Sequence, residues 1–336
     1  MRRTVGLLAT CLLSALAIAG CGGGNPNLFG PQPTPTPVAP SVTLEIPLPT
    51  ANSKPTAITR GPDGNLWLVE QGASKVAKAA GASSVTEYPT VTPNAGPSSI
   101  IDGPDNGLWI TYSTADKIAR LTASSGGFTE FSLTAGTHPQ QIISANGQLY
   151  FTEFGTNRIG VMTTAGILLS EFVIPTPNTG PMSIILGPDG ALWFTELNTS
   201  RIGRMLPGGE VTNEYPTVTP NAKPQTLVLG PDGALWFVEA GPQKLGRITI
   251  NGMVSEVSVA PATSISGLVV GADNKFYFGD PVGNKIGQLN ITGTMSVNEF
   301  PIPTANADPS FLELGFDAKV YFSEFLSSKL GQFTYF

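Results

Sequence analysis

The sequence predicts an all-β fold, a seven-bladed β-propeller of four-stranded antiparallel blades that occupies residues 42–336. The first reason is a unit of about 42 residues that repeats seven times, a period typical of propeller blades and not of helical solenoids. Clear copies are TEYPTVTPNAGPSSIIDGPDNGLWITYSTADKIARL from Thr86 and SEFVIPTPNTGPMSIILGPDGALWFTELNTSRIGRM from Ser170. The second reason is the abundance of Gly (39) and Pro (30), which is expected where many short strands are joined by tight turns.

Each repeat contains four β-like runs, which we designate A to D. In the copy from Ser170 the D run covers 170–174, and a loop rich in Pro and Asn follows it. The A run covers 183–186, a GPDG turn leads into the B run at 192–195, and the C run is the Arg-Ile-Gly segment. In the turn, Pro presets φ and Gly supplies the positive φ of the corner.

The two ends of the repeating region differ. The region opens with a D run at 42–48 and closes with a C run at 329–336. We therefore expect the N-terminal strand to complete the last blade, which would close the ring without exposed sheet edges.

Residues 1–20 are typical of a signal peptide. Arg2 and Arg3 precede an apolar stretch, 5–19, that is too short for a stable transmembrane helix. The stretch ends in IAGC, which resembles a bacterial lipobox and implies that Cys21 carries lipid after cleavage. The alternative is an ordinary signal peptide with a chance cysteine. The lipobox favours an extracytoplasmic protein anchored to the bacterial cell membrane or outer membrane.

Residues 21–41 contain the lipidated cysteine and a Gly/Pro-rich tether. The tether cannot bury a core and should be semi-extended. Cys11 leaves with the signal peptide, so the mature chain has no disulfide. The formal net charge is −6 and there is no basic stripe, which argues against nucleic-acid binding.

Every B run carries one aromatic residue in its middle. One interpretation is an aromatic platform for sugars or cations; the other, which we favour, is packing of each blade against the next. The residues are Trp67, Trp109, Tyr150, Trp193, Trp236, Tyr277 and Tyr321.

A second series concerns charge. A carboxylate follows most B runs and a basic residue comes five positions later, so we expect salt bridges across the B–C hairpins. The alternative is a ring of carboxylates at one mouth that holds a cation. The first residues are Glu70, Tyr112, Glu153, Glu196, Glu239, Asp280 and Glu324; the second are Lys75, Lys117, Arg158, Arg201, Lys244, Lys285 and Lys329.

Alternating strand direction places the D–A and B–C loops on one face and the GPDG turns, where we expect only architecture, on the other. A polar funnel near the axis of the first face is the expected binding site for a small molecule or protein. Its expected residues are Asn52, Asn94, Tyr112, Asn178, Asn221, Asn306, Glu153, Glu196 and Glu239.

The phrases GPDGALWFTE, RIGRM, TEYPTVTPN and NEFPIPTANADP resemble the virginiamycin B lyase family over residues 42–336. The resemblance implies a seven-bladed propeller and a magnesium-dependent carbon–oxygen lyase that opens the ester of a cyclic depsipeptide, streptogramin B. It also implies histidines as general acid and base, with a carboxylate nearby.

The family's histidines directly follow the Pro of the D–A loop in the last two blades. The matching positions here are Ser266 and Ser310, and the other blades have Thr56, Ser98, Gln140, Met182 and Gln225. The carboxylate that carries over is Asp308, with Glu324 in the same blade, and the two together are the candidate magnesium ligands. His138, the one histidine, precedes its Pro.

Three functions follow from these observations. The leading one is a membrane-tethered binding module that has kept the propeller and lost the lyase histidines. The second is an active lyase with a rearranged catalytic set drawn from Asp308, Ser310, Glu324 and His138. The third is another propeller hydrolase, such as a metal-dependent sugar lactonase.

Overall fold

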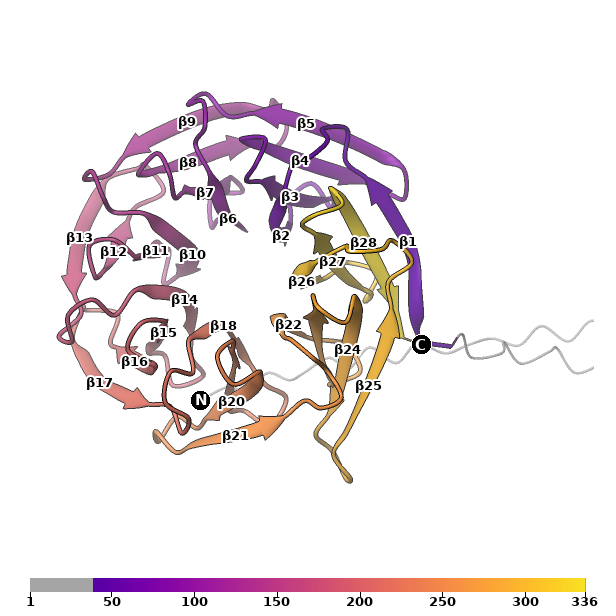
Figure 1. Cartoon of the computed structure of the whole chain (residues 1–336). Helices are drawn as coiled ribbons and strands as arrows, with labels where there is room; N and C mark the ends of the chain where they lie inside the picture. The colour runs from indigo at the N-terminus through magenta and orange to yellow at the C-terminus, as the bar shows by residue number, and fades with distance from the viewer. Residues whose placement is uncertain (1–38, 336) are drawn as a thin grey trace, which may run out of the picture. The chain divides into compact units, whose positions relative to one another are not determined.

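The computed structural model describes residues 39–335, which form seven four-stranded antiparallel sheets arranged as blades around a central axis (Figure 1). The predicted fold is confirmed. Within these residues no helix is long and apolar enough to cross a membrane. The predicted signal peptide, Cys21 and most of the tether lie outside the described residues.

The strands of each blade follow one another outward from the axis, so that the A strands are innermost (Figure 1). The first three blades contain β2 (Pro55–Arg60), β3 (Leu66–Glu70), β4 (Lys75–Ala80), β5 (Ser84–Pro89), β6 (Pro97–Asp102), β7 (Leu108–Tyr112), β8 (Lys117–Thr122), β9 (Gly127–Ser132), β10 (Pro139–Ala145), β11 (Gln148–Glu153), β12 (Arg158–Met162) and β13 (Leu168–Val173).

The remaining blades repeat this order. They contain β14 (Pro181–Leu186), β15 (Leu192–Glu196), β16 (Arg201–Met205), β17 (Val211–Pro216), β18 (Pro224–Leu229), β19 (Leu235–Glu239), β20 (Lys244–Ile248), β21 (Val254–Ser258), β22 (Ser266–Val270), β23 (Phe276–Asp280), β24 (Lys285–Asn290), β25 (Ser296–Pro301), β26 (Pro309–Leu314), β27 (Val320–Glu324), β28 (Lys329–Thr334) and β1 (Ser41–Pro47).

Strand β1 closes the ring, as predicted. It lies antiparallel to β28, with paired residues from Ser41 opposite Thr334 to Pro47 opposite Lys329. The seventh sheet therefore has the order β1-β28-β27-β26 and joins the two ends of the described chain. Without β1 the outer edge of β28 would present unpaired backbone groups.

The B strands are the most buried part of each blade, because neighbouring blades cover both faces of the sheet. Trp193 is representative: its indole nitrogen donates to Asp189 Oδ1 at 3.0 Å and its ring stacks on Tyr215 with centroids 5.7 Å apart. A Cβ at Gly187 would lie 2.5 Å from Trp193 Cδ1, so the GPDG turn requires glycine there. Six of the seven B-strand aromatics are buried, which confirms the packing interpretation.

Polar side chains of the B strands also tie three of the blades to the next one. The Thr152 hydroxyl donates to the carbonyl of Met182 at 2.9 Å, and that of Thr111 donates to the carbonyl of Gln140 at 2.6 Å. The seventh blade is joined to the first in the same way, by Ser323 Oγ and the Thr56 carbonyl at 3.1 Å. These bonds fix the main chain where the A strands begin.

Candidate functional site

A pocket of about 170 Å³ lies where the A strands begin, on the axis of the face that carries the D–A and B–C loops. This is the location predicted for the binding site. Its walls come from the first five blades and the seventh. They are Thr56, Gln71, Ser98, Ser99, Gln140, Gln141, Met182, Ser183, Gln225, Thr226 and Phe311.

The pocket walls include the residue after the loop Pro in five blades. In the sixth and seventh blades the matching residues are not part of the wall, and their hydroxyls donate to main-chain carbonyls. Ser266 Oγ donates to the Pro309 carbonyl, and Ser310 Oγ donates to the Asp308 carbonyl at 3.1 Å. Phe311, next to Ser310, takes part in the wall.

Every side chain that lines the pocket is uncharged. Glutamine amides and serine or threonine hydroxyls can both donate and accept hydrogen bonds, and Met182 and Phe311 add apolar surface. None of these groups accepts a proton near neutral pH, which general base catalysis requires. The pocket can therefore hold an uncharged group but cannot by itself remove a proton from it.

The predicted salt bridges across the B–C hairpins are wrong. Lys75 lies opposite Glu70 in the strand register, yet its ammonium group binds Glu87 of the outer strand β5 at 2.6 Å. In five blades, this one included, the basic residue pairs with the glutamate of the outer D strand and not with the residue at the end of the B strand. These pairs are Lys75–Glu87, Lys117–Glu130, Lys244–Glu256, Lys285–Glu299 and Lys329–Glu45.

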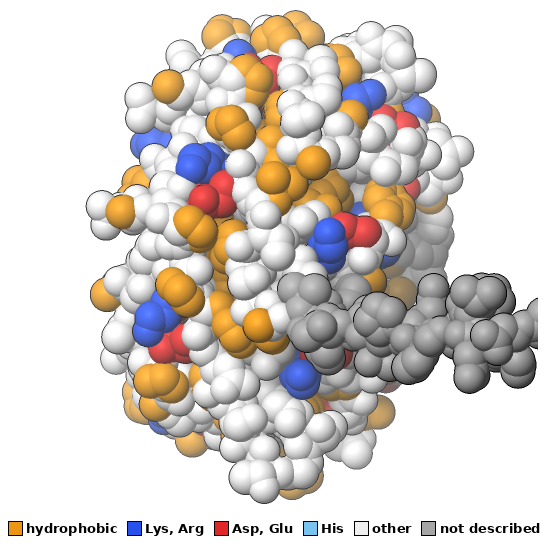
Figure 2. Space-filling view, turned by 90° about the vertical axis from the view of Figure 1, so that its right-hand side faces the viewer, with side chains coloured by type: hydrophobic (Ala, Val, Ile, Leu, Met, Phe, Trp, Pro, Cys, Tyr) orange, Lys and Arg blue, Asp and Glu red, His pale blue; other side chains and the backbone are white. Residues whose placement is uncertain are grey.

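Burial explains this choice of partner. Glu70, Glu153, Glu196, Glu239 and Glu324 have no exposed surface, and drawing an ammonium group into the interior would cost its hydration. The basic side chains stay partly exposed and pair with the outer carboxylates; Figure 2 shows Lys or Arg side chains beside Asp or Glu side chains on the outer surface. The inner glutamates, including Glu153, Glu196 and Glu239 of the predicted mouth, thus lie inside the blades and do not line the axial pocket.

These inner glutamates hold a proton more tightly than an exposed glutamate. Burial, and then the nearby carboxylate of Glu87, raises the pKa of Glu70 to about 8. Burial also raises the pKa of Glu196 to about 7, although the Thr199 hydroxyl, 2.7 Å away, opposes the shift. A protonated carboxyl group can donate as well as accept, which suits a buried site beside a second carboxylate.

Tyr112 replaces the inner glutamate in the second blade and is also fully buried. Its hydroxyl has no hydrogen-bond partner within the described residues. Burial, and then Glu130, raises its pKa. It therefore lies inside the blade and away from the pocket wall.

The five predicted asparagines, which begin with Asn52, are exposed and do not line the axial pocket. All have positive φ, between 52° and 56°. Asparagine tolerates the left-handed region better than most residues, so these positions serve the path of the D–A loops. The residues are Asn52, Asn94, Asn178, Asn221 and Asn306.

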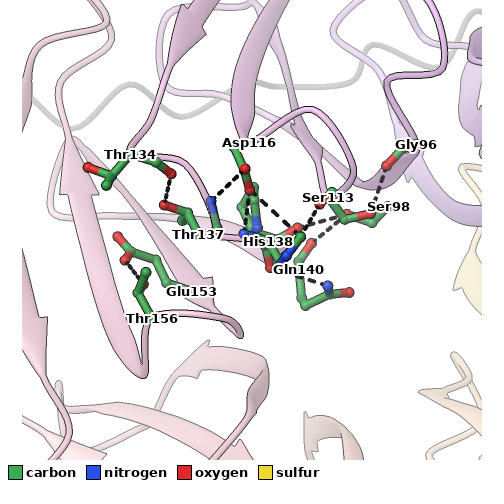
Figure 3. A network of polar contacts seen from close by, with 12 residues as sticks. Gly96, Ser98, Ser113, Asp116, Thr134, Thr137, His138, Gln140, Glu153 and Thr156 are labelled. Carbon is green, nitrogen blue, oxygen red and sulfur yellow. Dashed lines mark hydrogen bonds and ion pairs between the residues drawn. The ribbon is translucent and has the colours of Figure 1, made fainter.

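His138 lies on the same face but is not part of the pocket wall. Its main-chain nitrogen donates to Asp116 Oδ1 at 2.7 Å, and its Nδ1 lies 2.9 Å from the carbonyl of Ser113 (Figure 3). Half of the side chain is exposed. The ring is thus held by the B–C loop of the preceding blade.

The predicted catalytic set is not assembled. His138 directly precedes the first strand of the third blade, whereas Asp308, Ser310 and Glu324 belong to the seventh. Within the described residues, no contact joins His138 to any of these three. Glu324 is buried, and its Oε2 accepts a bond of 2.5 Å from Ser327. Burial raises the pKa of Asp308.

These residues do not fit magnesium. Magnesium prefers an octahedral shell of oxygens, usually with ionised carboxylates. Burial raises the pKa of Glu324 to about 7, so this group holds a proton more tightly than an exposed glutamate and is a poorer ligand for a cation. Within residues 39–335 no three His, Cys, Asp or Glu side chains gather closely enough to hold a metal ion.

Sequence reasoning missed several wall residues, including Gln71, Gln141 and Phe311. For Gln141 and Phe311 the signal was variation: at the second residue after the loop Pro, or its equivalent in the sixth blade, the blades carry Ala57, Ser99, Gln141, Ser183, Thr226, Gly267 and Phe311. A repeat that keeps its packing residues but varies at one register position marks that position as the one facing the axis.

Comparison with known proteins agrees with this geometry. No curated protein matches the sequence. A solved streptogramin B lyase structure is 33% identical, covers 86% of this chain and 96% of its own, and superposes with a TM-score of 0.80. Virginiamycin B lyase from Staphylococcus aureus is 32% identical, with a TM-score of 0.80 and coverage of 87% and 98%.

A third structure is a catalytically inactive histidine-to-alanine variant of the Staphylococcus aureus enzyme with quinupristin, 31% identical over 87% of this chain and 98% of that one, at a TM-score of 0.80. The model of the virginiamycin B lyase family matches residues 40–140 and 124–335. The chain therefore belongs to the virginiamycin B lyase family.

Proposed function

We propose that this protein is a membrane-anchored extracytoplasmic binding module whose ligand inserts an uncharged group into the axial pocket. The observation that carries the proposal is the wholly uncharged pocket wall at the centre of the site face. At about 170 Å³ the pocket resembles an engineered cavity of ~150 Å³ that accepts benzene. It would hold one side chain of a larger ligand that covers the mouth.

The same observation argues against an inherited elimination reaction. Removing a proton next to a carbonyl group needs a base with a pKa near neutrality. In a solved relative, a histidine-to-alanine variant is described as catalytically inactive. This chain has His138 alone, and its ring is bound to a neighbouring loop outside the pocket wall.

Binding can be tested with streptogramin B as the probe, because one of the solved relatives is a streptogramin B lyase. Titration calorimetry should show one bound molecule per chain. Met182→Glu should weaken binding at least about tenfold, since the new carboxylate would lose hydration in the occupied pocket. The matched control is Met253→Glu, because Met253 is 73% exposed and lies outside the pocket. Absence of binding, or equal weakening by both variants, would contradict the proposed site.

Membrane anchoring is tested separately from binding. Cys21→Ala should move the protein from the membrane fraction to the soluble fraction, because it removes the proposed lipidation site. Cys11→Ala, in the predicted signal peptide, should leave the protein in the membrane fraction. Retention of the Cys21 variant in membranes would show that the anchor lies elsewhere.

A further inference from the structure

A second cavity, of about 730 Å³, lies at the opposite mouth of the propeller. The axial pocket surrounds the first residues of the A strands, whereas this cavity surrounds their last residues, including Arg60, Asp102 and Ser144. Because the A strands run in the same direction along the axis, the two hollows open on opposite faces. Its size falls within the range of ~300–1,000 Å³ that is usual for small-molecule sites.

Glu313 breaks the pattern of the A strands at this mouth. Its register position lies opposite the B-strand aromatic residue in every blade, and the other six blades place a β-branched residue there. Those residues are Thr59, Ile101, Ile143, Ile185, Val228 and Val269, opposite Trp67, Trp109, Tyr150, Trp193, Trp236 and Tyr277. A carboxylate opposite Tyr321 adds nothing to packing, so it is a candidate for a role in binding.

The Glu313 carboxylate is recessed in the cavity wall and weakly engaged. Its Oε1 lies 3.6 Å from Arg60 Nε, beyond a normal hydrogen bond, and no other charged partner contacts it among residues 39–335. Thirty per cent of the side chain remains accessible. Burial nevertheless raises its pKa to about 7, with Arg60 opposing the shift, as expected for a group surrounded by protein but open to the cavity.

Asp102 is a second carboxylate in the cavity wall that is available to bind a ligand. Its side chain makes neither a hydrogen bond nor an ion pair in the described part of the chain. The neighbouring Asp63 and Asp105 are already bound by Lys78 at 3.3 Å and Arg120 at 2.6 Å. The cavity wall therefore carries two available carboxylates, and Arg60, about half exposed, is its single cation.

The rest of the wall offers apolar surface. Phe316 is 58% exposed, and Ile101 and Ile143 lie beside it in the lining. The Arg60 guanidinium already rests 5.7 Å from the centre of the Phe316 ring. That contact shows that the ring can hold a cation against its face, a position that Arg60 occupies.

We propose that this cavity binds a small organic cation with an apolar body. Its ammonium group contacts the carboxylate of Glu313, and Asp102 adds a second negative charge to the cavity wall. Its apolar body lies against Phe316, Ile101 and Ile143. The site is independent of the axial pocket, so one could fail without the other.

The test uses the propeller chain from Val38, which forms one compact unit, and three probes of similar size. These are phenethylammonium, the neutral 2-phenylethanol and the anionic 3-phenylpropanoate. Ligand-observed NMR titration should show that phenethylammonium binds at least about tenfold more tightly than either of the others, as expected for a charge-assisted contact. Equal binding of the three probes, or no binding of phenethylammonium at millimolar concentration, would overturn the proposal.

Variants then locate the site. Glu313→Gln should weaken phenethylammonium binding about tenfold, and Asp102→Asn should weaken it less. Glu210→Gln, which removes one exposed charge outside the cavity, is the matched control and should leave binding unchanged. Glu313→Ile supplies a residue found in three other blades and so keeps the fold. Unchanged binding in both Glu313 variants would refute the site.

Discussion

The residues that fill the blades and the residues that line the axial pocket come from the same repeat but vary in opposite ways. In four blades a Trp of the B strand donates to the Asp of its GPDG turn at 2.9–3.0 Å. Around the axis, by contrast, the residue that directly follows the loop Pro differs among the first five blades. These residues are Thr56, Ser98, Gln140, Met182 and Gln225. Packing against a neighbouring blade imposes the same demand every time, whereas a ligand on the axis meets each blade differently.

Removing β1 should have the largest effect, because it exposes the edge of β28 and takes the buried side chain of Ile46 away from its neighbours, such as Leu330. We expect a loss on the order of 5 kcal/mol or more, comparable with the whole stability of many domains. Chemical denaturation and light scattering would measure it. Deletion of residues 22–38 is the control and should change little. Similar stability of both shortened chains would show that ring closure matters less than the topology indicates.

Two substitutions in the fourth blade test the comparison directly. Trp193→Ala should cost about 3–5 kcal/mol, because it empties a fully buried site and removes one of the donors to Asp189. Met182→Ala, on the pocket wall, should cost less than about 1 kcal/mol. Urea unfolding of both variants measures the difference. Comparable losses would mean that the axial residues are structural too.

The buried glutamates predict a pH dependence of stability. Glu196 binds its proton more tightly in the folded chain, with a pKa of about 7, than in the unfolded chain, where it is near 4.5. Between these values the folded state holds more protons, so stability should fall as pH rises from about 5 to 8. Glu196→Gln should flatten this slope and raise the melting temperature at pH 8 by about 2–4 °C per kcal/mol regained. A steeper slope in the variant would contradict the assignment.

The fold was predictable because each strand, turn and closing contact belongs to the repeat. The functional site was less predictable from the sequence. Glu70 and Lys75 are adjacent across one hairpin, and the sequence alone suggested that they pair. Glu87 outcompetes Glu70 because it lies nearer the surface, and burial is a property of the assembled ring. A glutamate that recurs 12 to 14 residues after the basic residue was the available signal.

The direction of the strands was enough to locate the axial pocket. The sequence did not show which candidate residues lie close enough to act together. His138 and Asp308 both precede the loop Pro and both have positive φ, at 45° and 57°. Equivalent positions in different blades are held apart by the ring. Their similarity in sequence therefore reflects loop geometry and not a shared site.

The central claim is that the axis has kept a binding pocket without the means to break an ester. The direct test is to incubate the propeller chain with streptogramin B and excess magnesium and to follow the antibiotic by mass spectrometry. We predict that the cyclic compound persists. Formation of the linear product, with loss of that activity in His138→Ala or Asp308→Ala, would contradict the claim and establish a rearranged active site.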